Sequence, residues 1–213
     1  MNLYPFFLFI VLSAALYSCQ EAEGRSSVIR EGKFTVTQED TLPYILYIDS
    51  QYVYLDNGQK VHIAGLSDPR QQVLFVIRHA EEDSIGLDPG LSDKGNARAA
   101  RLVTLLRNAS IKNLYSILFR RTALTVRPLV KAYDLSIAHY DPDQVEYLTD
   151  YRIPENPENT LIVGTTRSVA ILLNLLTQSD DYSPLPKTIY DRMFIVLPAE
   201  HENDTVRVFA YRY

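Results

Sequence analysis

Residues 73–77 form an unbroken apolar run, and the polar residues Arg78, His79 and Glu81 follow it almost at once. Three of the five apolar residues are β-branched. This pattern predicts a central parallel strand that is covered on both faces. Ligands of open α/β sheets bind at the carboxyl ends of the strands, so we expect Arg78 and His79 to lie at a functional site.

Strand and helix patterns alternate after this run. Ser92 precedes an alanine-rich stretch and is the expected N-cap of a helix. Further strands are predicted at residues 115–118, 135–139, 160–164, 193–197 and 205–211, and further helices at residues 121–133, 143–149 and 169–176. The alternation predicts a layered α/β domain over residues 71–213, with a mostly parallel sheet between helices.

A small β appendage is predicted in front of this domain, over residues 30–70. It contains four short strand patterns, at residues 34–37, 44–48, 52–55 and 61–63. Asp56, Asn57 and Gly58 favour a hairpin turn, because Asn-Gly tolerates positive φ. So small a sheet is marginal alone, so we expect it to pack on the main domain. His62 follows the alternating pattern, which places it on a sheet face and not at a site.

The first eighteen residues contain no charged side chain and read as a signal peptide. Their apolar run is broken by Pro5 and is shorter than the ~20 residues of a membrane span. Residues 16–19, Leu-Tyr-Ser-Cys, resemble the bacterial lipobox, in which the cysteine is lipidated. We therefore expect Cys19 to carry a membrane anchor, residues 19–29 to be a polar tether, and the body to lie outside the cytoplasm in a bacterial cell envelope. The alternative is an ordinary signal peptide with an incidental cysteine.

The net charge of −5 argues against a general binder of nucleic acids, because such binding needs a basic surface. Any anion site must therefore be local. The sequence contains no P-loop, no GxGxxG and no clustered cysteine and histidine spacing, so no metal or organic cofactor is indicated.

Several of these motifs together resemble the histidine phosphatase superfamily, the phosphoglycerate-mutase-like proteins. The matching residues, in the order of the family, are Arg78-His79-Ala80-Glu81, Leu91-Ser92 with Gly95, Tyr115-Ser116 with Arg121 and Thr125, the strand at 160–164, and Tyr190-Asp191-Arg192. The resemblance covers roughly residues 71–213. It implies a phosphoglycerate-mutase-like fold and a phosphate pocket that needs no cofactor.

In this family the histidine after the arginine attacks phosphorus, so the resemblance makes His79 the nucleophile. Imidazole suits this role because its neutral form is available near pH 7. Arg78 and Arg121 would hold the phosphoryl oxygens, since a guanidinium is a charged fork of donors. The leaving-group acid is not identified by any motif. Five carboxylates are candidates, with Glu81 included among the catalytic residues: Glu81, Glu82, Asp83, Asp141 and Asp143.

One position departs from the family pattern. A second pocket histidine normally follows the glycine of the strand at 160–164, and this chain has Thr165 there. Losing one such donor typically costs ~10²–10³ in rate. Thr165, Thr166 and Arg167 are the remaining candidates for substrate binding at the start of the next helix, whose free N–H groups favour anions. The alternative is that Thr165 only caps the helix and that Arg167 lies on the surface.

Three hypotheses remain open. The first is a slow phosphatase that hydrolyses phosphate esters through phosphohistidine on His79. The second is a phosphatase-like protein that binds a phosphorylated small molecule or another phosphate-like anion without turnover, which Thr165 favours. The third is a surface lipoprotein whose β appendage binds a partner.

Overall fold

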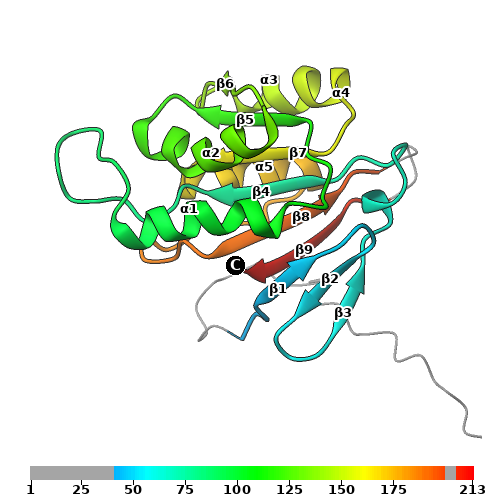
Figure 1. Cartoon of the computed structure of the whole chain (residues 1–213). Helices are drawn as coiled ribbons and strands as arrows, with labels where there is room; N and C mark the ends of the chain where they lie inside the picture. Colours follow the sequence, from blue (N-terminus) through cyan, green and yellow to red (C-terminus); the bar gives the residue numbers. More distant parts are fainter. Residues whose placement is uncertain (1–40, 200–204) are drawn as a thin grey trace, which may run out of the picture.

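The structure, a computed structural model, describes residues 41–199 and 205–213, and its centre is a six-stranded sheet (Figure 1). The strands, in sheet order, are β6 (Ala138–Tyr140), β5 (Asn113–Ile117), β7 (Thr160–Gly164), β4 (Leu74–Arg78), β8 (Arg192–Leu197) and β9 (Arg207–Arg212). The first four are parallel, and β8 and β9 run antiparallel. The predicted layered α/β fold with a mostly parallel sheet is confirmed.

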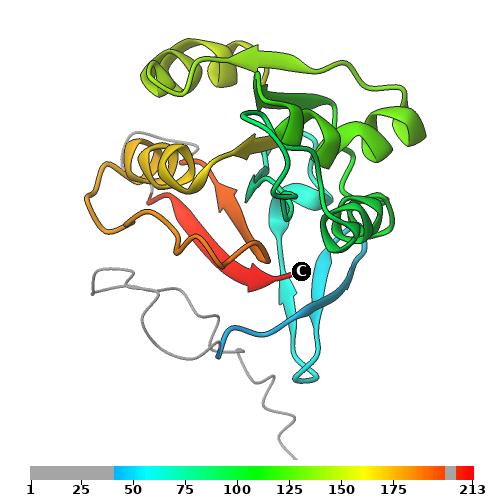
Figure 2. The ribbon, with the colours of Figure 1, turned by 90° about the vertical axis from the view of Figure 1, so that its left-hand side faces the viewer.

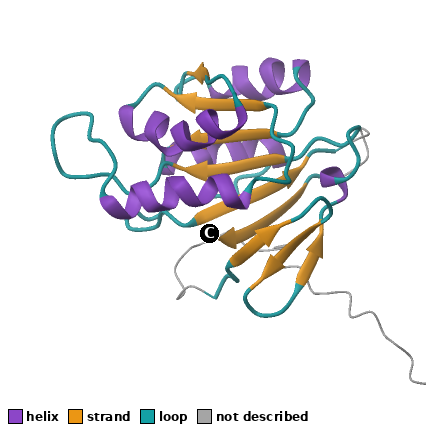
Figure 3. Ribbon diagram, viewed as in Figure 1, coloured by secondary structure: helices purple, strands orange, loops and turns teal. Residues whose placement is uncertain are grey.

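Helices cover both faces of this sheet (Figure 3). The longer ones are α1 (Asp93–Leu105), α2 (Arg120–Tyr133) and α5 (Thr166–Thr177). Because side chains alternate along a strand, Phe75 and Ile77 of β4 pack with α1 and α2, whereas Leu74 and Val76 pack with α5. All five residues of β4 are buried, which confirms a strand that is covered on both faces.

A second sheet of three antiparallel strands lies between α1 and β9 (Figure 2). It consists of β1 (Ile45–Ile48), β2 (Tyr52–Leu55) and β3 (Lys60–His62), with a turn at Gly58 where φ is +81°. The buried side chains of this small sheet belong to the same hydrophobic cluster as Phe75. Arg101 of α1 also donates to the carbonyl of Ile45 at 2.6 Å. The small sheet and the α/β body therefore share one core.

Two elements differ from the sequence expectation. Strand β6 begins only at Ala138, three residues later than predicted. The helix predicted at residues 143–149 is a series of short pieces, α3 (Val145–Tyr147), η2 (Leu148–Arg152, one π-helical turn) and α4 (Ile153–Glu155).

A short 3-10 helix, η1 (Ala64–Leu66), leads from the small sheet to β4. The predicted signal peptide, Cys19, the tether at residues 19–29 and the strand at 34–37 lie outside the described residues.

Among residues 41–199 and 205–213, no helix combines the length and the apolar character that crossing a membrane requires.

Candidate functional site

The candidate site lies at the carboxyl end of β4, where β7 runs beside it. Arg78 is paired with Gly164 of β7, and the His79 N–H donates to the Gly164 carbonyl at 2.9 Å. A side chain at Gly164 would press on Ser168 Oγ and on the Tyr140 hydroxyl, at 2.4 and 2.9 Å from the added carbon. Gly164 therefore allows α5 to begin directly beside His79.

The imidazole of His79 is buried, and its two ring nitrogens have different partners. Nδ1 lies 2.8 Å from the Ala80 carbonyl oxygen, which can only accept, so Nδ1 carries the proton. Nε2 accepts from Nε–H of Arg121 at 3.3 Å, so it holds a lone pair. Burial lowers the pKa of His79 to about 4. His79 is therefore neutral at pH 7, with its basic nitrogen facing Arg121.

Arg121, in the first turn of α2, is held by two carboxylates of the loop between β4 and α1. Its Nε lies 3.2 Å from Glu82 and its Nη1 lies 3.7 Å from Asp88. Asp88 also accepts the N–H of Arg120 with both oxygens at 3.0 Å, so it caps α2 from a neighbouring segment. The Phe119 ring lies 4.6 Å from the Arg121 guanidinium. These contacts fix a cation next to the free nitrogen of His79.

Arg78 is buried and projects toward the turn before β8. Its Nη1 donates to the carbonyls of Lys187 and Ile189, both at 2.8 Å. The ring of Tyr190 lies 3.8 Å from the guanidinium carbon and 5.8 Å from the His79 ring. Two arginines thus flank the histidine, which is the arrangement that the sequence predicts for Arg78, His79 and Arg121.

Glu81 has a different environment from the one expected of a catalytic residue. Its carboxylate makes a two-point ion pair with Arg98, at 2.7 and 2.9 Å, and lies 3.3 Å from Lys94. Burial alone would raise the pKa of Glu81, but the hydrogen bonds and charge of Arg98, with a hydrogen bond from Lys94, lower it to about 2. Glu81 therefore carries no proton near pH 7. Its ion pairs with Arg98 and Lys94, which both lie on α1, connect the segment after His79 to that helix.

The start of α1 explains two residues of the predicted motif. Ser92 is the N-cap, and its Oγ accepts the Gly95 N–H at 3.2 Å, as predicted. A side chain at Gly95 would lie 2.1 Å from the Glu81 carbonyl oxygen. Only glycine therefore lets α1 approach the segment that follows His79.

Of the other four candidate carboxylates, Glu82 is the one that contacts an arginine beside His79 in the described part of the chain, through its ion pair with Arg121. The backbone N–H of Asp143 donates to the Asp141 carboxylate at 2.9 Å, in a turn after the edge strand β6. That strand is three positions from β4, roughly 14 Å away at normal strand spacing. Asp83 accepts from the Ile85 N–H within its own loop.

The departure at Thr165 has a clear structural role. Thr165 is the N-cap of α5: its Oγ1 accepts the Ser168 N–H at 3.3 Å, and its own N–H donates to Ser168 Oγ at 2.9 Å. The hydroxyl is therefore engaged with its own helix. Thr166 is partly exposed and Arg167 is exposed on the first turn of α5. No contact of either side chain with His79 is found among the described residues.

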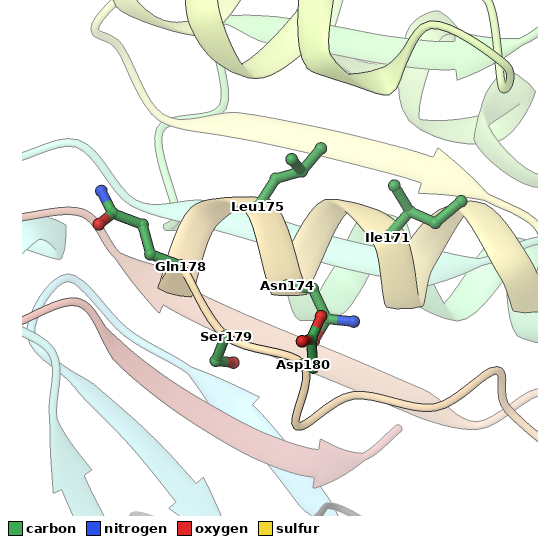
Figure 4. A pocket seen from close by; sticks show the side chains of 6 residues that line it. All are labelled: Ile171, Asn174, Leu175, Gln178, Ser179 and Asp180. Carbon is green, nitrogen blue, oxygen red and sulfur yellow. The ribbon is translucent and has the colours of Figure 1, made fainter.

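Two cavities of the described structure lie elsewhere. The larger one, of about 470 Å³, lies along the second half of α5 and past its end (Figure 4). It is lined by Ile171, Asn174, Leu175, Gln178, Ser179 and Asp180. The smaller one, of about 170 Å³, lies between the approach to β4 and the β8–β9 connection. Neither is lined by Arg78, His79 or Arg121.

The layered α/β fold of this chain, with its mostly parallel sheet between helices, is similar to the fold of several solved structures. One similar solved structure is the protein histidine phosphatase SixA in complex with tungstate. It has a TM-score of 0.54 and 14% identity, over 66% of this chain and 96% of SixA.

Two further structures have a TM-score of 0.50. A mycobacterial glucosyl-3-phosphoglycerate phosphatase, in complex with inorganic phosphate, is 14% identical over 66% of this chain and 97% of its own. Bacillus stearothermophilus YhfR is 16% identical over 64% and 95%. At these identities the likeness establishes the fold. No protein-family model and no curated protein sequence matches the chain.

Sequence reasoning missed three residues that organise the site: Tyr190, Arg98 and Asp88. Tyr190 was noted only as part of a matching motif, and its contact with Arg78 depends on a turn more than 100 residues away. Arg98 falls in the second turn of an expected helix, and no motif pairs it with Glu81. Asp88 lies in a loop with no periodic pattern, and no sequence signal pairs it with α2.

Proposed function

We propose that this protein is a histidine-phosphatase-like hydrolase that cleaves phosphate esters through a phosphohistidine on His79. The observation that carries the proposal is the geometry of His79. Its proton is on Nδ1, its lone pair is on Nε2, and the buried Arg78 and the partly buried Arg121 are both close enough to act on its charge. A neutral nucleophile between two cations suits attack on a dianionic phosphoryl group.

The reaction has two balanced steps. In the first, Nε2 attacks phosphorus, the ester P–O bond breaks, and the departing alcohol takes up a proton. In the second, water attacks phosphorus, the P–N bond breaks, and phosphate and neutral His79 are released. Arg121 would move its Nε–H from Nε2 to a phosphoryl oxygen when the substrate enters. Glu82, beside Arg121, is the carboxylate best placed to exchange protons with the alcohol and the water.

Turnover should be slow, because Thr165 replaces a donor and its hydroxyl is bonded to Ser168. The same observation favours a second candidate, in which the site binds a phosphorylated small molecule or phosphate-like anion without turnover. The two candidates share Arg78 and Arg121 as anion ligands. They differ only in whether the P–O bond breaks.

The test is phosphate release from an aryl phosphate by wild type, His79→Ala and Arg78→Ala, together with melting temperatures at rising inorganic phosphate. A hydrolase shows release that His79→Ala abolishes. The binding candidate shows no release, but a melting temperature that rises with phosphate in wild type and His79→Ala and not in Arg78→Ala. Absence of both responses in wild type contradicts the proposal.

We also propose that the protein is an extracytoplasmic lipoprotein, with residues 1–18 as signal peptide and Cys19 as the acylated residue. The support is the uncharged apolar leader and the lipobox-like sequence that ends at the single cysteine. Cys19→Ser should then leave unprocessed or soluble material. A wild-type N-terminal peptide without the mass of acyl chains would contradict the anchor.

A further inference from the structure

The turn before β8 holds one side of the Arg78 guanidinium. Its geometry is set locally: Leu185 is buried in the core, and the Ile189 N–H donates to the Pro186 carbonyl at 2.9 Å. The carbonyls of Lys187 and Ile189 then receive Nη1 of Arg78 at 2.8 Å. A carbonyl can only accept, so these bonds hold the guanidinium without neutralising it.

The opposite edge of the same guanidinium, which carries Nε, lacks the acceptor that Nη1 has. Nε of Arg78 is buried and has no hydrogen-bond partner among the described residues. In Arg98, the corresponding edge, formed by Nε and Nη2, binds the carboxylate of Glu81. A buried donor without an acceptor is costly, and a phosphoryl oxygen is a suitable acceptor for it.

Tyr190 lies against both members of the arginine–histidine pair. Its ring is stacked on the Arg78 guanidinium at 3.8 Å and meets the His79 ring edge to face at 5.8 Å. Such a contact restricts rotation of a guanidinium about its long side chain, which hydrogen bonds to Nη1 alone do not. The ring therefore determines which edge of the Arg78 guanidinium faces away from the carbonyls of Lys187 and Ile189.

We propose that Tyr190 is a positioning residue that, with the carbonyls of Lys187 and Ile189, presents the Nε edge of Arg78 to an oxyanion bound beside His79. The inference rests on the proposed phosphate site. It adds that anion affinity depends on the ring of Tyr190, although this side chain carries no charge.

Two substitutions separate the ring from its hydroxyl. Tyr190→Phe keeps the ring, and Tyr190→Leu removes it but keeps an apolar side chain. Tyr151→Leu is the matched control, since Tyr151 is 57% exposed and pairs with Tyr147 on another part of the surface. Each full-length variant is titrated with inorganic phosphate by calorimetry. The Nε–H signal of Arg78 is followed by NMR before and after phosphate is added.

Tyr190→Leu should weaken phosphate binding about tenfold, the size of one partly buried cation–π contact, whereas Tyr190→Phe and Tyr151→Leu should stay within about twofold of wild type. The Arg78 Nε–H signal should shift in Tyr190→Leu even without phosphate. Wild-type affinity in Tyr190→Leu would overturn the proposal. An equal loss in Tyr190→Phe would also overturn it, because the ring would then not be the cause.

Failure of the proposed function gives a different result. If wild type binds no phosphate, the phosphate site is wrong, and the ligand-free NMR signal then decides the role of Tyr190. A signal that Tyr190→Leu shifts and Tyr151→Leu does not supports positioning of Arg78. A signal unchanged in both overturns it.

Discussion

Burial lowers the pKa of His79 more than any charged neighbour does. Desolvation is the largest cause of its low pKa, and the nearby Arg78 and Arg121 act in the same direction. The hydrogen bond to Ala80 opposes them but mainly fixes the tautomer. The result is a nucleophile that stays neutral well below the usual histidine range.

This burial predicts a pH-dependent stability. The pKa of His79 is lowered from 6.5 to about 4 on folding, so the unfolded chain binds the proton more tightly. Stability from this group is complete above pH 6.5 and is lost as the pH falls toward 4. Linkage gives a loss of about 2 kcal/mol between pH 7 and pH 5. Urea unfolding of wild type and His79→Gln at both pH values measures it, and equal losses in the two proteins would contradict it.

A second prediction at the residue scale concerns Glu82, whose carboxylate lies 3.2 Å from Nε of Arg121 and would compete with a bound anion for that donor. Neutralising it should free the guanidinium, and Glu82→Gln should strengthen phosphate binding about threefold, within the range of partly exposed ion pairs. Asp83→Asn is the control, because Asp83 makes no ion pair with Arg121 among the described contacts. Calorimetry with inorganic phosphate gives the comparison. Weaker binding in Glu82→Gln would show that the carboxylate supports the site instead.

At the scale of elements, the sequence predicted regular segments better than irregular ones. Strand β7 is found where it was predicted because four apolar or β-branched residues precede Gly164 and all five are buried. One helix was predicted at residues 143–149, but α3 covers only Val145–Tyr147 and a π-helical turn follows it directly. For the site, Arg78 and His79 were predicted from their place at a strand end and Arg121 from the family resemblance, and the structure brings Arg121 to His79. Tyr190 and Asp88 were not, because tertiary contacts alone bring them to the arginines.

The start of α5 carries a prediction with two opposite effects. Thr165→His restores the donor that the family pattern has, and turnover of an aryl phosphate should rise ~10²-fold. The same change removes the side-chain cap and should cost about 1 kcal/mol of stability. Wild type, Thr165→His and the double variant with His79→Ala are compared by rate and by urea unfolding. A stable Thr165→His that gains no turnover but binds phosphate favours the binding candidate.

At the scale of the whole molecule, the small sheet and the α/β body should unfold together because they share one hydrophobic cluster. Ile48 of β1 is fully buried in that cluster, and Ile48→Ala should cost about 2–5 kcal/mol in a single transition. Leu46→Ala, at a side chain that is 53% exposed, is the control and should cost far less. Two separate transitions in either variant would mean that the small sheet is an independent unit.

The loop between β4 and α1 projects from the body at the left of Figure 1, and its Ile85 and Leu87 are 75% and 106% exposed. Proteases that cut beside large aliphatic residues should therefore cleave here first. The cut ends would stay attached through β4 and α1, so the nicked protein should remain folded. Asp88 would nevertheless lose its fixed position on α2, and with it one of the two carboxylates that hold Arg121. Controlled digestion would thus separate the rigidity of the site from the integrity of the fold, without changing a single amino acid.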